Sequence, residues 1–122
     1  MKTRLYIAGP YSADNVIGVL NNMRHGIRIS TRAMLAGFSP FCPWLDFHFQ
    51  LNLQGSEQLT VQDYYRYSMD WLRVSDAVYV LSGWQNSTGT KFEIAEAKQL
   101  GIPVFYEDQG ITVEALSNRG LN

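Results

Sequence analysis

The sequence predicts an α/β domain with a parallel sheet and helices on both faces. Short apolar runs of strand-forming residues alternate with segments whose apolar residues recur at helical spacing. The first such run, Leu5–Ala8, is apolar throughout, as expected for a central strand buried on both faces. This alternation implies right-handed crossovers between parallel strands. Because the chain has 122 residues, we expect residues 1–122 to form a single domain.

Leu5–Ala8 is the first predicted strand and ends at Gly9-Pro10. A long helix is predicted from about Asp14, with Asp14 or Ser12 as its cap and Gly37 at its end. Its apolar positions are Val16, Leu20, Met23, Ile27 and Met34.

A second, short strand is predicted over Phe38–Cys42. Pro40 and Pro43 favour an edge position for it, because proline cannot donate to a neighbouring strand. Residues 43–59 show no clean period and are expected to form a loop, with at most a short helical turn, that lies over another part of the molecule.

Thr60 and Asp63 open the next predicted helix in the manner of a capped start, and this helix is expected to end near Ser75. Ala77–Leu81 is the clearest strand. A helix then begins near Gly89. It closes at residue 101, and a last buried strand follows over residues 103–106, with a weak helix at 113–117.

The composition of the chain limits which binding partners and which cellular location are expected. Ten Lys and Arg against eleven Asp and Glu give a net charge of −1, which favours neither a nucleic acid polymer nor an anionic membrane. Cys42 is the single cysteine, so no internal disulfide can form and a reducing cytoplasm is expected. No apolar run approaches the length of a membrane span, and Gly9-Pro10 interrupts any signal peptide.

In parallel sheets, ligands bind beyond the carboxyl ends of the strands, where the strand order reverses. That rule selects residues 9–12, the loop after Phe41 and residues 83–89, which we expect to converge on one pocket. In the first segment, Gly9, Pro10 and Tyr11 follow a strand directly. Gly9 lets a ligand approach the backbone, and Tyr11 is suited to stacking on a planar ring.

The segment Ser87–Glu93 is the strongest candidate for chemistry. Free amides at the helix start, with Ser87, Gly89 and Thr90, would bind a phosphate or carboxylate. Ser87 or Thr88 is equally suited to capping the helix, and capping is compatible with binding an anion. Glu93, about one turn into the helix, is either a nucleophile or base facing the crevice, or a solvated acid that favours the helix dipole.

Neither a dinucleotide fingerprint nor a triphosphate-binding loop is present, so no cofactor is expected. Asp46 and His48, with Cys42 nearby, are too scattered to favour a metal site. We interpret Asp46 and His48 as part of a polar pocket wall.

Taken together and in this order, five segments resemble the nucleoside 2-deoxyribosyltransferase superfamily, over nearly the whole chain. The similarity is greatest to its small phage and bacterial members of unknown function and to 2'-deoxynucleoside 5'-phosphate N-hydrolases. The segments are Tyr6–Pro10, Tyr67–Leu72, Ser75–Val78, Ser87–Glu93 and Gly101–Val104. The resemblance implies a three-layer flavodoxin-like or Rossmann-like fold with a four- to five-stranded parallel sheet.

The resemblance also implies cleavage of an N-glycosidic bond, with Glu93 as the nucleophile at the anomeric carbon of the sugar. Water would complete a hydrolysis, whereas a second base would complete a transfer. Relatives acting on 5'-monophosphates carry a serine at the position of Ser87, where the transferases for free nucleosides have an aspartate. A hydroxyl suits a phosphate and an aspartate would repel it, so a monophosphate substrate is favoured.

One position departs from the family. Relatives commonly carry an aspartate where this chain has Ser68, and Asp70 lies two residues later. Two helical residues turn a side chain through about 200°, so Asp70 replaces it only in a different register. Either Ser68 performs only part of the role of that aspartate, another acid such as Asp46 supplies the proton to the departing base, or hydrolysis is slow or absent.

Three alternatives to a hydrolase follow. They are base exchange by a deoxyribosyltransferase, a non-catalytic module that senses nucleotides, and a phage accessory protein with an unused pocket. Relatives are generally dimers or larger, and the aromatic side chains Tyr64, Tyr65 and Trp71 are compatible with such an interface. The expected partners are therefore a small nucleotide or nucleoside and further copies of this chain.

Overall fold

The computed structural model describes residues 2–121 and contains one parallel sheet of four strands, in the order β2-β1-β3-β4. The predicted parallel α/β class is confirmed, with four strands. The strands and helices are β1 (Arg4–Ala8), α1 (Val16–Leu35), β2 (Ser39–Phe41), α2 (Phe47–Leu51), α3 (Val61–Leu72), β3 (Ala77–Val80), α4 (Thr88–Gln99) and β4 (Val104–Tyr106), with a 3-10 helix η1 (Pro43–Asp46) before α2.

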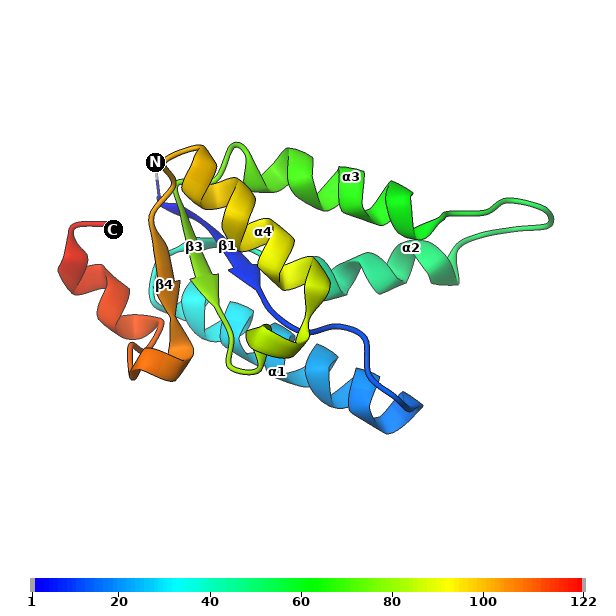
Figure 1. Cartoon of the computed structure of the whole chain (residues 1–122), viewed down its shortest axis with the longest axis horizontal. Coiled ribbons are helices and arrows are strands. Elements are labelled where there is room, and N and C mark those ends of the chain that lie inside the picture. The colour runs from blue at the N-terminus through cyan, green and yellow to red at the C-terminus, as the bar shows by residue number, and fades with distance from the viewer. Residues whose placement is uncertain (1, 122) are drawn as a thin grey trace.

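The sheet separates two apolar cores and thereby forms the middle of three layers (Figure 1). On one face, Ile29 and Ala33 of α1 pack with Val113 and Leu116 of the C-terminal segment. On the other face, α3 and α4 contribute a second set of buried residues: Met69, Leu72, Ile94 and Ala97. Within the described residues, no helix combines the length and apolar character required to cross a membrane.

Strands β1 and β3 supply both cores because successive side chains of a strand point to opposite faces. Leu5 and Ile7 of β1 join the core beneath α1, whereas Tyr6 and Ala8 join the core beneath α3 and α4. Every side chain of Leu5–Ala8 and Ala77–Val80 is buried. This explains why both strands are apolar throughout.

The start of α1 differs from the sequence prediction. Asn15, and not Asp14 or Ser12, is the N-cap, and its side chain accepts a hydrogen bond from the Gly18 amide (2.8 Å). Val16 and Met34, which we expected on the buried face, are 72% and 66% exposed. The helix instead buries Ile29 together with three small residues, Gly26, Ser30 and Ala33.

The boundaries of other elements also differ from the predicted ones. Residues 43–59 contain η1 and α2, so more of this segment is helical than predicted. Helix α3 has the predicted capping box of Thr60 and Asp63 but ends at Leu72, three residues before Ser75. Strand β4 is half-buried rather than buried because it lies at the sheet edge. The predicted tail helix is a 3-10 helix over Glu114–Arg119.

Candidate active site

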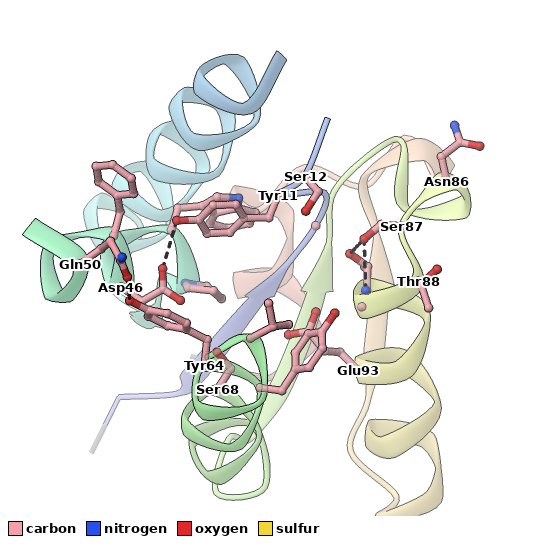
Figure 2. A pocket seen from close by; sticks show the side chains of 18 residues that line it. Tyr11, Ser12, Asp46, Gln50, Tyr64, Ser68, Asn86, Ser87, Thr88 and Glu93 are labelled. Carbon is pink, nitrogen blue, oxygen red and sulfur yellow. Dashed lines mark hydrogen bonds between the residues drawn. The ribbon is translucent and has the colours of Figure 1, made fainter. Parts of the chain in front are cut away.

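The pocket lies where the strand order reverses, beyond the carboxyl ends of β1 and β3. It has a volume of about 550 Å³, within the range of small-molecule sites. The three segments predicted to converge do so, and α3 closes the remaining side (Figure 2). The lining residues are Gly9, Tyr11, Ser12, Pro43, Trp44, Asp46, Phe47, Gln50, Val61, Tyr64, Tyr65, Ser68, Asn86, Ser87, Thr88, Gly89, Thr90 and Glu93.

The N-terminus of α4 forms one end of the pocket. Ser87 is the N-cap, and its hydroxyl accepts hydrogen bonds from the amide (3.2 Å) and the hydroxyl (2.8 Å) of Thr90. The first backbone bond of the helix runs from the Lys91 amide to the Ser87 carbonyl (3.0 Å), so the preceding amides of Thr88 and Gly89 have no partner within the helix. Capping by Ser87 therefore coexists with two free amide donors beside the pocket.

Glu93 lies on the pocket wall one turn into α4, and its carboxylate accepts a hydrogen bond from the phenol of Tyr6 on β1. Burial raises the pKa of Glu93 to about 7, although the Tyr6 hydrogen bond acts in the opposite sense by stabilising the carboxylate. The same burial and the nearby Glu93 raise the pKa of Tyr6 well above its usual value. Glu93 is thus a carboxyl that titrates near neutral pH.

Ser68 of α3 completes the surroundings of this pair. Its side chain is buried, lines the pocket and hydrogen-bonds the Tyr6 phenol, which lowers the pKa of Tyr6. Tyr6 therefore connects Ser68 to Glu93, the candidate nucleophile. Ser68 reaches Glu93 through this phenol.

The opposite wall carries a second carboxyl. Asp46, the last residue of η1, accepts a hydrogen bond at Oδ1 from the Tyr11 hydroxyl (3.1 Å) (Figure 2). Burial raises the pKa of Asp46, and the Tyr11 hydrogen bond partly offsets that increase. Nearby, the Tyr64 hydroxyl donates to Oε1 of Gln50 (2.8 Å). This wall therefore offers hydrogen-bonding groups and aromatic rings together.

Trp44 holds the wall in place. Its ring is 1% exposed, and its Nε1 donates to the Pro10 carbonyl (3.0 Å), which ties η1 to the loop after β1. The ring packs against α1 at Gly26, where a Cβ atom would lie 2.3 Å from the indole. Glycine at position 26 therefore permits the approach of Trp44 that fixes two pocket segments.

Most of the predicted site residues line one pocket, and three do not. The predicted residues in its lining are Gly9, Tyr11, Asp46, Ser68, Ser87, Gly89, Thr90 and Glu93. Asp70 lies outside, because its exposed carboxylate faces Arg73 at 3.6 Å, so its position does not support a catalytic role. His48 is exposed on α2 away from the lining. Pro10 contributes through Trp44 rather than by lining the pocket.

Sequence reasoning missed Tyr6, Trp44 and Gln50. A usable signal existed for Tyr6, because it carries a hydroxyl in an otherwise aliphatic central strand and a buried phenol requires a partner. Gly89 also has a second role, since a Cβ atom there would lie 3.1 Å from the Tyr65 hydroxyl. Its lack of a side chain lets Tyr65 close over the start of α4.

The pocket carries acidic charge only. Asp46 and Glu93 are the charged residues of its lining, which contains no Lys, Arg or His among the described residues. Across residues 2–121, no three or more His, Cys, Asp and Glu side chains are grouped in a way that could hold a metal ion. The described lining itself supplies two carboxyls, several hydroxyls and free backbone amides.

Comparison with solved structures identifies the class of fold. One similar structure is a conserved protein from Enterococcus faecalis V583, with a TM-score of 0.64 and 20% identity. The match covers 87% of this chain and 63% of that one, so this chain spans less than two thirds of its neighbour. The two proteins share this fold at low sequence identity.

A second structure gives that class its name. It is a 2-deoxyribosyltransferase from the psychrotolerant bacterium Bacillus psychrosaccharolyticus, with a TM-score of 0.56 and 17% identity over 84% of this chain and 70% of that one. The chain thus has a nucleoside deoxyribosyltransferase-like fold. Residues 47–106 match the domain of unknown function DUF4406. No curated protein shows significant similarity.

Proposed function

We propose that this protein hydrolyses the N-glycosidic bond of a nucleoside or deoxynucleoside 5'-monophosphate through a covalent glycosyl ester on Glu93. The observation that carries the proposal is the position of the Glu93 carboxylate, which lines a ligand-sized pocket and titrates near neutral pH. A carboxylate so placed is ionised in a large fraction of molecules at pH 7 and above. It is then available to attack an anomeric carbon.

The first step forms a bond between a Glu93 oxygen and the anomeric carbon while the bond from that carbon to the base nitrogen breaks. The electron pair of the broken bond leaves with the base, which takes up a proton. Water then attacks the same carbon, loses a proton and releases Glu93 as a carboxylate. The Tyr6 phenol, as a hydrogen-bond donor, stabilises the carboxylate before the first step and after the second.

The phosphate part of the proposal rests on the start of α4. The free amides of Thr88 and Gly89 and the positive end of the helix dipole suit a phosphate, and the Ser87 hydroxyl is beside them. Opposite, the Tyr11 ring and the hydrogen-bonding groups of Asp46 suit a planar base. A nucleotide spanning the pocket would bring its sugar between these ends, beside Glu93.

Base exchange is the second candidate. The absence of Lys and Arg from the described pocket lining favours an unphosphorylated nucleoside, because two acidic groups would oppose a phosphate dianion. The solved neighbour is itself a 2-deoxyribosyltransferase. A chromatographic screen of nucleosides and monophosphates, with and without an acceptor base, separates the two: free base alone indicates hydrolysis, and a new nucleoside indicates transfer.

Glu93→Gln tests the nucleophile. We expect the variant to fold and bind nucleotide but to release base at least ~100-fold more slowly, because an amide cannot form the ester. Base release is measured by chromatography and nucleotide binding by calorimetry. Release at the parent rate would contradict the assignment. Tight binding by the parent protein without release over hours would instead favour a nucleotide-sensing module.

We also propose that the protein acts in the cytoplasm as a homodimer or larger oligomer. Support for an oligomer comes from large side chains that the single chain leaves exposed beside the pocket, with Tyr65 45% and Phe92 62% exposed. Both residues line an apolar depression at the start of α4. A location in the cytoplasm suits a chain whose single cysteine can form no internal disulfide.

A further inference from the structure

Asp46 is an acid in the pocket wall that the fold does not require. It occupies the N-cap position of α2 but makes no capping hydrogen bond, and no Lys, Arg or His pairs with it among the described residues. Its one hydrogen bond, from Tyr11, engages Oδ1 and leaves Oδ2 free. A half-buried carboxyl without an ion pair costs stability, which is typical of a functional group.

Asp46 also lies on the wall opposite Glu93, on a different structural element (Figure 2). Most glycosidases that act through a carboxylate nucleophile also use a second carboxyl, and the two carboxyls flank the scissile bond. That second group protonates the leaving group, which otherwise departs as an unstable anion. Asp46 and Glu93 are the pair of carboxyls in the described lining, and they stand on opposite sides of it.

Other lining groups are weaker proton donors. Burial raises the pKa of the Tyr11 phenol, and that of Tyr64 is raised as well. Ser68, at the position where relatives carry an aspartate, has only a hydroxyl and is directed to Tyr6. We propose that Asp46 is the general acid that protonates the departing base, with Tyr11 as the residue that positions its carboxyl. This inference rests on the proposed function.

The atoms balance over both steps. In the first, Asp46 gives its proton to a ring nitrogen of the base as the bond from that base to the anomeric carbon breaks, and a Glu93 oxygen bonds to the carbon. Asp46 is then a carboxylate. In the second step it takes a proton from the attacking water, whose oxygen bonds to the anomeric carbon as the Glu93 ester bond breaks. Both carboxyls return to their starting states.

The productive form has Asp46 protonated and Glu93 ionised, so the two groups share one proton. Such a pair gives a bell-shaped pH profile whichever group holds the proton more tightly. The other titratable groups facing the pair are Tyr6, Tyr11, Tyr64, Tyr65 and Cys42. The pKa values of Tyr6, Tyr11, Tyr64 and Cys42 are raised. Groups with raised pKa values stay protonated over the pH range in which the two carboxyls titrate. Their own titration therefore does not mask the rise and fall of activity that the carboxyls cause.

The experiment compares substrates that differ in their need for a proton. One pair is deoxyguanosine 5'-monophosphate and its N7-methyl derivative, whose cationic base leaves as a neutral molecule; deoxyuridine 5'-monophosphate and its 5-nitro derivative are the pyrimidine pair. We expect Asp46→Asn to lower kcat about 100-fold or more on the unactivated substrate and less than about 10-fold on the activated one. The high-pH fall in activity should also disappear in Asp46→Asn.

Asp14→Asn is the matched control, because Asp14 is exposed outside the pocket lining and should lose no activity on either substrate. Asp46→Ser replaces Asp46→Asn if circular dichroism shows that the asparagine variant does not fold. Equal losses on both substrates of a pair would overturn the role of Asp46 as general acid and leave the proposed function standing. Failure of the parent protein to cleave either pair would overturn the proposed function, and this inference with it.

Discussion

Glu93 carries a measurable cost at the residue scale. Its pKa is about 7 in the folded protein against an ordinary value of 4.5, because burial disfavours the carboxylate. Between these values the folded state binds more protons than the unfolded state, so stability falls as pH rises from about 4.5 to about 7. The difference between the two pKa values corresponds to about 3 kcal/mol of stability. This is an upper bound, because Glu93 keeps some contact with the open pocket.

Glu93→Gln should remove this dependence because glutamine carries no charge at any pH. We expect the stability of the variant relative to the parent to increase by about 2–3 kcal/mol between pH 5 and pH 8. Urea unfolding of both proteins at several pH values measures the difference. Parallel stability curves for the two proteins would show that burial does not perturb Glu93.

At the scale of elements, α3 depends on its capped start. Thr60 and Asp63 form a capping box in which the Thr60 side chain accepts from the Asp63 amide (3.2 Å) and Asp63 accepts from the Thr60 amide (2.7 Å). This helix also carries Tyr64, Tyr65 and Ser68 to the pocket. A loose first turn would therefore disturb both the fold and the site.

Thr60→Ala should cost about 1 kcal/mol of stability, because it leaves first-turn amides without an acceptor. Chemical denaturation followed by circular dichroism provides the measurement. Thr31→Ala is the matched control, because Thr31 lies on the exposed side of the interior of α1, where alanine is a better helix former. If both variants lost equal stability, the capping box would not be the cause.

The elements also show how far sequence reasoning extends. The strands β1 and β3 and the capping box of α3 follow from neighbouring residues and were predicted. For α4 the sequence left Ser87 and Thr88 as candidate caps, and the structure has Ser87. Residues 43–59 were not, because η1 and α2 have no regular apolar period and are held by contacts from elsewhere, such as that of Trp44 with Gly26. Helix α1 shows the same limit, since the close packing at Gly26 selects which of its faces is buried.

At the scale of the whole molecule, the side chains exposed beside the pocket predict that copies of the chain assemble. The structure leaves Phe92 62% exposed next to Glu93 in sequence, and Tyr65 45% exposed across the same depression. Burying such side chains against another copy would remove apolar surface from water. An interface at this position would also lie beside the pocket.

Analytical ultracentrifugation should therefore detect a species of at least twice the chain mass. Phe92→Glu should shift the equilibrium to the monomer, because assembly would then bury an unpaired charge in the interface. Lys91→Glu is the control, because it introduces the same side chain at an exposed neighbouring position. A monomeric parent protein at all concentrations tested would contradict the oligomer. A Phe92→Glu variant that assembles like the parent would place the interface elsewhere.

The sequence by itself determined the order of strands and helices, the start of α4 and the location of the candidate site at Ser87–Glu93. These features depend on local propensity, capping and the alternation of strands with helices, which neighbouring residues specify. Only the tertiary structure decided the partners of the carboxyls. Tyr6 meets Glu93 across 87 residues and Tyr11 meets Asp46 across 35, and no local pattern encodes either pairing. The elevated pKa of Glu93 has the same origin, because packing of distant elements excludes water from its carboxyl.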